Sequence, residues 1–434
     1  MFIYLIIYNF LLAVSSILSL PFIWRRIKPD REFPSGLKER LGIYDRETIK
    51  QLKKQKNIWI HTVSIGEFLS ITPLIKRLQE ENKNNIVITF STKTGRRVAE
   101  KRFNNIKYLF FPVDIYPVIR STISKINPGI IVIIETEFWP CLLYIAHRQK
   151  IPVLLINGRL SPFSYPKYKM FRFFTRQILP LFSAISMRSE EEAGKLIYLG
   201  ADRNRVKVVG SMKFDLAYEM GKTVNPDKVM ESLKIEKEKH IVVFGSLHPA
   251  EELPVIEIAE KLLKIFDDMV VIIVPRYLDK TDVYNILKNR GMNFIRKSEL
   301  PSDKKYSIVV VDTYGELNNF YAISEFAFVG GSLYMWGGQN PIEPLAFKKP
   351  VLYGPYHWHF KEEWQKIKEG GGGIEVSDYD ALLRECIHLL KNPDECIRIG
   401  EMGYHTLLQN TGATEKNKRL LLHFIEHGNQ GYHF

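Results

Sequence analysis

The run Ile130-Ile131-Val132-Ile133-Ile134, followed at once by Glu135-Thr136-Glu137, decides how this chain folds. Five consecutive branched apolar residues are typical of a strand that is buried on both faces, as in a parallel sheet covered by helices. Two carboxylates directly after such a strand indicate a polar site, because ligands bind at the carboxyl ends of the strands in folds of this class.

The same alternation of short apolar runs and helical stretches extends in both directions. It predicts strands over residues 58–61, 86–90, 107–111, 130–134, 152–156, 184–187 and 206–209, and amphipathic helices over 69–81, 95–103, 118–126 and 190–199. A polar stretch over 215–239 interrupts the rhythm, and strands are predicted again over 240–244, 269–274, 308–311, 326–329 and 350–353. The predicted fold is α/β, with two doubly wound, Rossmann-like domains over 25–222 and 223–434 that face a central cleft.

The chain opens with an apolar run. Residues 1–24 contain no charged side chain and are followed by Arg25, Arg26 and Lys28. A helix of that length measures roughly 36 Å, enough to cross a hydrocarbon core of about 30 Å. Because the positive charge follows the run, we expect an uncleaved N-terminal membrane anchor with a cytoplasmic body, rather than a cleaved signal peptide. Spanning the bilayer and lying in its interface both fit the run.

The positive charge of the chain is concentrated in its first half. Residues 1–223 hold 36 Lys and Arg against 18 Asp and Glu, a net +18, whereas the remainder holds 25 against 30, a net −5. This distribution suits an anionic membrane surface or an anionic lipid substrate. No nucleic-acid-binding signature accompanies it. The three cysteines lack metal-ligand spacing and fit a reducing compartment.

Three polar residues of the first domain follow predicted strands. Glu67 comes after Gly66 at the start of a predicted helix, where its carboxylate could alternatively serve only as a helix cap. Glu135 ends the strand quoted above, and Lys213 follows the strand over 206–209. We expect these three side chains to line the cleft.

Glycine-rich junctions mark the second domain. They are Gly245-Ser246, Val274-Pro275-Arg276, Tyr314-Gly315-Glu316, Gly330-Gly331-Ser332 and the segment from Gly337 to Pro344. Such junctions offer backbone N–H groups and helix N-termini to a phosphate, and Glu343 could accept hydrogen bonds from a ribose diol. None matches a P-loop or the dinucleotide-binding spacing, so the pattern predicts a nucleotide site of another type.

These residues resemble a known family, the Kdo (3-deoxy-D-manno-oct-2-ulosonic acid) transferases of lipopolysaccharide assembly, which are membrane-associated glycosyltransferases of GT-B architecture. The most specific motifs are His61-Thr-Val-Ser-Ile-Gly-Glu67, Glu135-Thr-Glu-Phe-Trp-Pro140, Gly210-Ser-Met-Lys-Phe-Asp215, Val274-Pro-Arg276, Val329-Gly-Gly-Ser332 and Gly337-Gly-Gln-Asn-Pro-Ile-Glu343. The resemblance implies transfer of Kdo from CMP-Kdo to a lipid A precursor (lipid IVA), at the cytoplasmic face of the inner membrane.

The resemblance also implies roles for single residues. Glu67 would be the general base, and Glu135 and Lys213 would stabilise the transition state. The residues that would hold CMP are Pro275, Arg276, Tyr314, Gly315, Glu316, Asn340, Pro341, Ile342 and Glu343. Tyr314 and Gln339 depart from the residues frequent in the family, which weakens any side-chain contact expected there.

The expected partners are CMP-Kdo, an anionic lipid A precursor and the bilayer, with no nucleic acid. We expect no cofactor besides the donor substrate and no metal, because Asp378-Tyr379-Asp380 precedes a helical run and is interpreted as its N-cap. Two alternatives remain: another GT-B nucleotide-sugar transferase or epimerase, and a non-catalytic membrane-tethered sensor of nucleotides or lipids. A preference for UDP over CMP would favour the first, and a lack of any activity the second.

Overall fold

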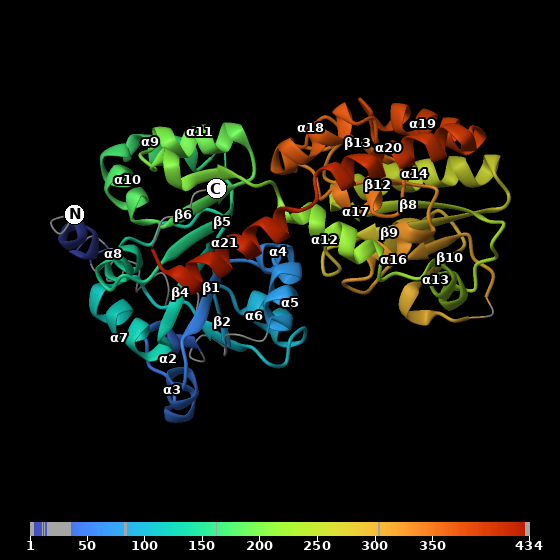
Figure 1. The fold of residues 1–434 in the computed structure, drawn as a ribbon. Helices are drawn as coiled ribbons and strands as arrows, with labels where there is room; N and C mark the ends of the chain where they lie inside the picture. Colours follow the sequence, from blue (N-terminus) through green and yellow to red (C-terminus); the bar gives the residue numbers. More distant parts are fainter. Residues whose placement is uncertain are drawn as a thin grey trace. The chain divides into compact units, whose positions relative to one another are not determined.

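A computed structural model describes residues 4–10, 12, 14, 36–81, 85–161, 163–302 and 304–429. The chain forms two compact units (Figure 1). Unit 1 comprises Met1–Met212 and Gly412–Phe434, and unit 2 comprises Lys213–Thr411. Each unit contains a parallel sheet covered by helices, which confirms the predicted doubly wound α/β fold of GT-B type.

Unit 1 is built, in its described part, on a parallel sheet of seven strands in the order β3-β2-β1-β4-β5-β6-β7. The strands are β1 (Asn57–Thr62), β2 (Asn85–Phe90), β3 (Lys107–Phe110), β4 (Pro128–Ile134), β5 (Val153–Gly158), β6 (Ala184–Met187) and β7 (Val206–Val208). All seven were predicted. The side chains of residues 130–134 are fully buried, as the unbroken apolar run requires, and Ile131 pairs with Trp59 on one side and Val153 on the other.

The helices of unit 1 cover both faces of this sheet. They are α2 (Leu37–Arg40), α3 (Arg46–Lys53), α4 (Ile65–Ser70), α5 (Thr72–Glu80), α6 (Lys93–Glu100), α7 (Tyr116–Ile126), α8 (Pro140–Arg148), α9 (Tyr165–Met170), α10 (Arg172–Ile178), α11 (Glu190–Tyr198) and α21 (Ala413–His427), with short 3-10 turns at Leu179–Leu181 and Arg203–Arg205. The helix predicted over 69–81 is in fact two, α4 and α5. Pro73 lies in the first turn of α5, where its missing N–H group costs no hydrogen bond.

Unit 2 repeats the design with a second parallel sheet, of order β10-β11-β9-β8-β12-β13-β14 in its described residues. Its strands are β8 (His240–Leu247), β9 (Met269–Pro275), β10 (Phe294–Arg296), β11 (Ile308–Val310), β12 (Phe326–Val329), β13 (Val351–Tyr353) and β14 (Gly373–Glu375). The sequence analysis missed β10 and β14. Both are three-residue strands at the edges of the sheet. An edge strand has a neighbouring strand on one side only and is less fully buried, so it does not require a long apolar run.

The helices of unit 2 pack on its sheet in three apolar clusters. They are α12 (Met212–Gly221), α13 (Pro226–Leu233), α14 (Pro249–Ile265), α15 (Val283–Asn289), α16 (Leu317–Ile323), α17 (Ile342–Leu345), α18 (Lys361–Glu369), α19 (Tyr379–Lys391) and α20 (Pro393–Gln409), with 3-10 turns at Lys297–Glu299 and Trp358–Phe360.

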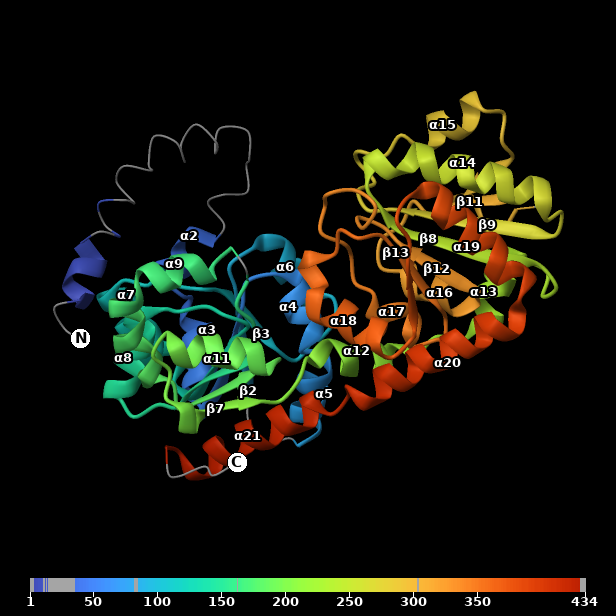
Figure 2. The same cartoon turned by 90° about the horizontal axis from the view of Figure 1, so that it is seen from above.

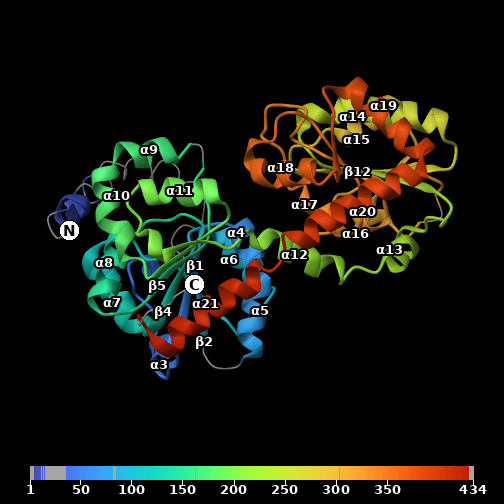
Figure 3. The same ribbon diagram turned by 45° about the horizontal axis from the view of Figure 1, so that its top comes forward.

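The boundaries of the two units differ from the predicted 25–222 and 223–434. The first boundary falls at Met212, in the first turn of α12, and the chain returns to unit 1 at Gly412. The return is made by α21, which lies along α5 (Figures 2 and 3). Leu420, Leu421 and Phe424 of α21 are buried in the core of unit 1, so this helix belongs to the first sheet.

The predicted anchor over residues 1–24 lies mostly outside the described residues. Residues 4–10 are helical and lie on unit 1 near α8 and α10 (Figure 1). Leu5 is buried in the core of that unit. In the described ranges, no helix combines the length and the apolar composition that a membrane crossing requires.

Candidate functional site

Three glutamates of unit 1 line one cavity at the carboxyl ends of its central strands. Glu67 follows β1, and Glu135 and Glu137 follow β4, the neighbouring strand. The cavity has a volume of about 170 Å³, and its other lining residues are Thr136, Arg159, Ser161 and Ser164. The structure therefore brings the predicted residues Glu67 and Glu135 together.

Glu67 combines a helix-capping position with a perturbed carboxyl group. Ser64 caps α4 by accepting a hydrogen bond from the Glu67 N–H, and the Glu67 carboxylate accepts bonds from the Val63 N–H at 2.7 Å and the Ser64 hydroxyl at 3.2 Å. Burial, followed by the nearby charge of Glu135, nevertheless raises the pKa of Glu67 to about 7. Such a pKa suits a group that accepts a proton near neutral pH, so capping alone does not describe this residue.

Glu135 is held at the end of β4 by a buried cation. Arg188, directly after β6, donates a hydrogen bond to Glu135 Oε1 and another to the Asn157 carbonyl at 3.1 Å. Glu135 and Asn157 both have positive φ angles, +61° and +56°, which non-glycine residues rarely adopt. Backbone strain at the ends of two adjacent strands is typical of functional sites, where surrounding contacts hold it in place.

His61 is a neighbour of Glu137, one of the residues that line this cavity. His61 is fully buried, stacks on Phe111 with ring centroids 3.8 Å apart, and has its pKa lowered to about 3 by burial. Its Nδ1 lies 3.1 Å from the Thr89 carbonyl oxygen, which can only accept a hydrogen bond. Nδ1 therefore carries the proton, and Nε2 is unprotonated. Burial and the charge of Glu135 raise the pKa of Glu137 to about 7.

Lys213, the third predicted catalytic residue, belongs to unit 2 rather than to the first domain. Its Nζ lies 3.7 Å from Glu363 Oε1 and 4.3 Å from the centre of the Phe360 ring. Lys213 and Arg276 both oppose the rise that burial causes in the pKa of Glu343. The structure thus groups Lys213 with predicted nucleotide-binding residues.

The remaining predicted residues of unit 2 gather at the carboxyl ends of its strands. Pro275 ends β9, and the Arg276 N–H donates to the Leu247 carbonyl at 2.7 Å. Arg276 is exposed. The Tyr314 hydroxyl accepts from the Leu278 N–H at 3.4 Å, so the 314–316 turn lies beside the loop after β9. Gly315 has a φ of +87°, and Glu316 pairs with Lys297 at 2.8 Å.

The segment from Asn340 to Glu343 forms a local hydrogen-bonded turn. Asn340 Nδ2 donates to Glu343 Oε1 at 2.9 Å, and Asn340 Oδ1 accepts from the Ile342 N–H at 3.3 Å. Pro341 precedes α17, which is only four residues long. A helix of one turn has a small dipole, so the strong helix N-terminus expected here is not formed.

The expectation of free backbone N–H groups is wrong for three glycines of the two glycine pairs. The Gly331 N–H donates to Glu251 Oε2 at 2.6 Å, the Gly330 N–H to the Gly245 carbonyl at 2.8 Å, and the Gly338 N–H to the Gly331 carbonyl at 2.8 Å. These glycines allow close packing and positive φ angles, but their donors are used within the unit.

Sequence reasoning gave no role to three residues of these regions, although His248 stands in the junction that begins with Gly245-Ser246. Arg188 was detectable as a charged residue directly after a buried strand, as Glu135 was. His248 and Trp336 stack with ring centroids 4.9 Å apart and an interplanar angle of 22°, close to Arg276, which helps burial lower the pKa of His248. The signal for Trp336 was a large aromatic residue inside a glycine-rich loop.

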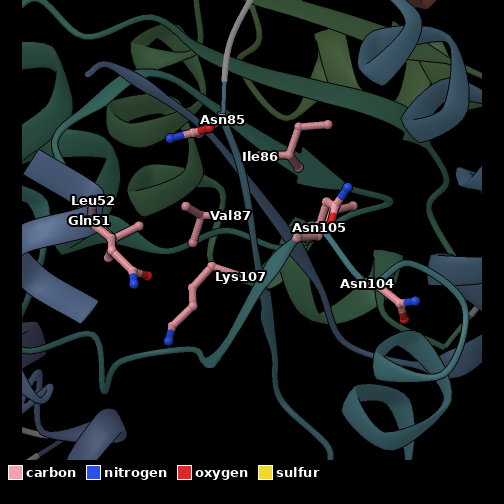
Figure 4. A pocket seen from close by; sticks show the side chains of 9 residues that line it. Gln51, Leu52, Asn85, Ile86, Val87, Asn104, Asn105 and Lys107 are labelled. Atoms are coloured by element: carbon pink, nitrogen blue, oxygen red, sulfur yellow. The ribbon is translucent and has the colours of Figure 1, made fainter. Parts of the chain in front are cut away.

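A second cavity of unit 1 lies at the opposite edge of the sheet. Its volume is about 300 Å³, and its lining includes Asn85 and Lys107, the first residues of β2 and β3 (Figure 4). The side chains around it are amides, aliphatic residues and one lysine. No carboxylate is among the residues that line this cavity.

Asp378 caps α19, as predicted, by accepting a hydrogen bond from the Ala381 N–H at 2.7 Å. Across the described ranges, no group of three or more His, Cys, Asp or Glu residues is placed to hold a metal ion. Metal independence stays a prediction, since the donor substrate could itself bring a cation.

Comparison with known proteins identifies the chain's relatives. Residues 35–216 match the family model described as 3-deoxy-D-manno-octulosonic-acid transferase (kdotransferase). The chain is 30% identical over 429 residues to the 3-deoxy-D-manno-octulosonic acid transferase of Haemophilus influenzae, covering 96% of this chain and 98% of that protein. It is also 30% identical over 397 residues to a bifunctional glycosyltransferase/methyltransferase of Fusobacterium nucleatum, covering 89% of this chain but only 60% of that protein.

Solved structures show the same architecture at low sequence identity. A UDP-GlcNAc 2-epimerase from Neisseria meningitidis, bound to UDP-GlcNAc, has a TM-score of 0.62 at 15% identity, with 85% of this chain and 100% of that chain covered. A glycosyltransferase from Rickettsia africae has a TM-score of 0.57 at 17% identity, with 86% and 99% covered. These two show the fold. The match along almost the full length of the Haemophilus influenzae protein shows the family, and this chain belongs to the 3-deoxy-D-manno-octulosonic acid transferases.

Proposed function

We propose that this Kdo transferase moves Kdo from CMP-Kdo to a lipid A precursor, lipid IVA, with Glu67 as general base and without a metal ion. The observation that carries the proposal is the Glu67 carboxyl group, which is half-buried beside Glu135 in one cavity and has a pKa of about 7. A base with that pKa is ionised in a large fraction of molecules at neutral pH and still has affinity for the proton of a sugar hydroxyl.

In the proposed reaction, a hydroxyl oxygen of the acceptor forms a bond to the anomeric carbon of Kdo. The bond from that carbon to the phosphate oxygen of CMP breaks, and its electron pair leaves with CMP. The hydroxyl proton moves to Glu67. The anomeric carbon gains positive character on the way, which Glu135 stabilises with its negative charge, while Arg188 fixes the position of that carboxylate.

Unit 2 is proposed to bind the donor. Arg276 and Lys213 supply positive charge for the phosphate of the leaving CMP, and Glu343 accepts hydrogen bonds from the ribose. Pro275, Gly315, Pro341 and Ile342 shape the backbone around the nucleotide, and Asn340 orients Glu343 through its 2.9 Å bond. Because Glu316 pairs with Lys297, we propose that it contributes through its backbone.

The site of action is proposed to be the cytoplasmic face of the inner membrane. The net charge of +18 on residues 1–223 supports an anionic lipid acceptor, and the apolar run over 1–24 supports attachment of the protein to the bilayer. A second candidate, a nucleotide-sugar epimerase, is favoured only by the fold that the epimerase structures share with this chain.

The experiment that tests the proposal incubates the purified protein with CMP-Kdo and lipid IVA in detergent and weighs the lipid product. We expect a mass increase by one or more Kdo residues, and no product from UDP-sugars. Glu67→Gln should form product about 10²–10⁴ times more slowly, whereas Glu80→Gln, a change at an exposed glutamate of α5, should behave as wild type. Epimerisation of UDP-GlcNAc, followed by NMR of the nucleotide sugar and without any lipid product, would favour the epimerase, and neither transfer nor epimerisation with any donor would favour the sensor.

A further inference from the structure

The segment between β5 and α9 contributes the one positive charge that lines the cavity of the three glutamates. Arg159, Ser161 and Ser164 belong to this segment and line the cavity together with Glu67 and Glu135; it is here called the Glu67 cavity. Because β5 neighbours β4 in the sheet (Figure 1), its carboxyl end lies beside the end of β4 that carries Glu135. Among the described residues that line the cavity, Arg159 is the one with a basic side chain.

The backbone of Arg159 is fixed by bonds to well-placed polar side chains. Thr136, which lies between two of the glutamates, accepts a hydrogen bond from the Arg159 N–H at 3.0 Å, and its hydroxyl donates to the Arg159 carbonyl. The next N–H, that of Leu160, donates to Glu192 Oε1 at 3.0 Å, and Glu192 is buried in the first turn of α11. The folded sheet therefore holds Arg159 at the cavity, as a binding residue requires.

Ser161 and Ser164 add hydroxyl groups to the same lining. Ser161 Oγ accepts a hydrogen bond from the Ser164 N–H at 3.0 Å, and the two hydroxyl oxygens are 2.9 Å apart. The Ser164 hydroxyl also lies 3.2 Å from the Ser161 carbonyl, to which it can donate. A guanidinium and hydroxyl donors suit a carboxylate, which only accepts hydrogen bonds and which arginine can bind through two parallel bonds.

The proposed reaction brings a carboxylate to this cavity. In a 2-ulosonic acid the anomeric carbon is bonded directly to the carboxylate carbon, at about 1.5 Å. The attacking hydroxyl oxygen lies about 3 Å from its base and about 3–3.5 Å from the carbon that it attacks. The carboxylate carbon is therefore within about 8 Å of the Glu67 carboxylate, whichever way the sugar ring is turned.

The charges already present in the cavity oppose such a carboxylate. Burial and the charge of Glu135 raise the pKa of Glu67 and that of Glu137 to about 7, which shows that a further negative charge is unfavourable here. Arg188 is paired with Glu135 and is not among the residues that line the cavity. Arg159 is thus the lining cation that can offset the charge of a sugar acid.

We propose that Arg159, with the hydroxyl groups of Ser161 and Ser164, binds the carboxylate of the transferred sugar and so selects a 2-ulosonic acid over a neutral sugar. The inference rests on the proposed function, since it takes the sugar that reacts beside Glu67 to be Kdo. Arg159 binds substrate in this assignment, and proton transfer stays with Glu67.

The test removes the guanidinium and the sugar carboxylate separately and together. Transfer to lipid IVA in detergent is measured for wild type and Arg159→Met, with CMP-Kdo and with the carboxamide of CMP-Kdo as donors. The ratio of kcat/KM for the acid to that for the amide should fall about tenfold or more in Arg159→Met, as expected when a hydrogen bond between charged groups is lost. The intrinsic reactivities of the two donors cancel in this comparison. Binding of CMP, which lacks the sugar, should stay unchanged in calorimetry.

Arg148→Met is the matched control. Arg148 is an exposed arginine at the last residue of α8, which leads from the carboxyl end of β4 to the amino end of β5, so it lies at the opposite edge of the sheet. This variant should keep the wild-type donor ratio. Arg159→Lys retains the charge without the planar guanidinium and should keep more of the preference than Arg159→Met does. If melting curves show that Arg159→Met is not folded, Arg159→Gln takes its place, and its ratio should fall as well.

An unchanged donor ratio in a folded variant that lacks the charge of Arg159 would overturn the proposal. A phosphate of the acceptor is the other anionic group that could reach this residue. If the variants raise the KM for lipid IVA but not the KM for its dephosphorylated form, Arg159 binds the acceptor and the proposal is wrong. Failure of the proposed function gives a different result, because wild type would then form no lipid product from CMP-Kdo and the inference would fall with it.

Discussion

The unprotonated Nε2 of His61 lies 4.0 Å from the Oε2 of Glu137, a residue that lines the Glu67 cavity. His61 Nε2 has no hydrogen-bond partner among the described atoms. The neutral imidazole of His61 cannot compensate the negative charge of an ionised Glu137. The charge of Glu135 repels that of Glu137. Glu137 is therefore a glutamate that the folded chain keeps partly protonated near neutral pH.

This arrangement predicts how stability depends on pH. The folded state holds a proton on Glu137 up to about pH 7, whereas the ordinary carboxyl pKa is 4.5, so the stability from this group falls as pH rises across that window. The side chain introduced by Glu137→Gln is neutral at every pH, so this variant does not lose stability at that position as pH rises. We expect the melting temperature of the variant to decline less between pH 5 and pH 8 than that of wild type. Glu80→Gln serves as control, and identical pH profiles for Glu137→Gln and wild type would contradict the prediction.

A second prediction concerns the pH dependence of transfer. If ionised Glu67 is the base, kcat/KM should rise with pH and level off above about 7, the pKa to which burial and Glu135 raise this carboxyl. Glu67→Gln should reduce the rate by about 10²–10⁴ while CMP binding, measured by calorimetry, is kept. Glu137→Gln should move the acid limb to slightly lower pH, because Glu137 also repels the Glu67 charge. If kcat/KM of the wild type instead levelled off with an apparent pKa near 4.5, the assignment of Glu67 as the general base would be wrong.

The sequence predicted that Glu67 and Glu135 line the same site. Each residue comes after a buried strand, and the carboxyl ends of parallel strands share one edge of the sheet. The long apolar runs of β1, β4 and β9 were likewise sufficient to predict a buried parallel sheet. Lys213 was assigned to the first domain because the polar stretch from residue 215 was taken as the junction, whereas the chain crosses between the units in the first turn of α12, two residues after Gly210.

The return of α21 to unit 1 could not be predicted from its own residues. An amphipathic helix fits many sheets, and its placement depends on partners far away in sequence. Arg77 of α5 pairs with Glu415 at 3.2 Å, and Lys418 pairs with Glu81 at 3.1 Å. Neither partner shows a local sequence signal. Arg188 and Glu135 each follow a buried strand and so carry a local signal, but their pairing is established only in the folded sheet.

The proposed donor site predicts that loss of the Arg276 side chain weakens CMP binding but not acceptor binding. Arg276→Ala should weaken CMP binding by about 1.5–3 kcal/mol, the range for a hydrogen bond to a charged group, and leave acceptor binding nearly unchanged. Arg290→Ala, which removes an arginine paired with Glu260 on the surface of the same unit, is the matched control. Equal losses for CMP and acceptor in calorimetry would contradict the assignment of donor binding to unit 2.

Removal of metal ions should leave transfer unchanged. The leaving phosphate has cationic side chains available in Arg276 and Lys213, so no divalent ion is required to neutralise it. Turnover measured in excess EDTA should match that of the untreated enzyme. Loss of turnover that Mg²⁺ restores would mean that the donor complex recruits a cation, and a variant at Asp378 would then show whether α19 is involved.

The helical turn over residues 4–10, which lies on unit 1, gives the last prediction. Asp114 is buried and accepts bonds from the Cys141 and Leu142 N–H groups at 3.0 and 2.9 Å, as well as from Tyr8. Burial raises the pKa of Asp114 to about 6, so the carboxylate is ionised above that pH and the Tyr8 hydroxyl then donates to a charged acceptor. Tyr8→Phe should cost about 1–3 kcal/mol of stability at pH 8, and less at pH 5.

Tyr4→Phe is the control, because it removes a hydroxyl from the same turn while the ring contacts with Phe173 and Phe174 remain. Denaturant unfolding of both variants at the two pH values provides the measurement. Deletion of residues 1–24 should destabilise unit 1 at least as much as Tyr8→Phe, since Leu5, Tyr8 and Asn9 are lost together. Unchanged stability of the deleted protein would show that this turn leaves unit 1 in solution, and activity lost on deletion must be corrected for folding before it is attributed to membrane attachment.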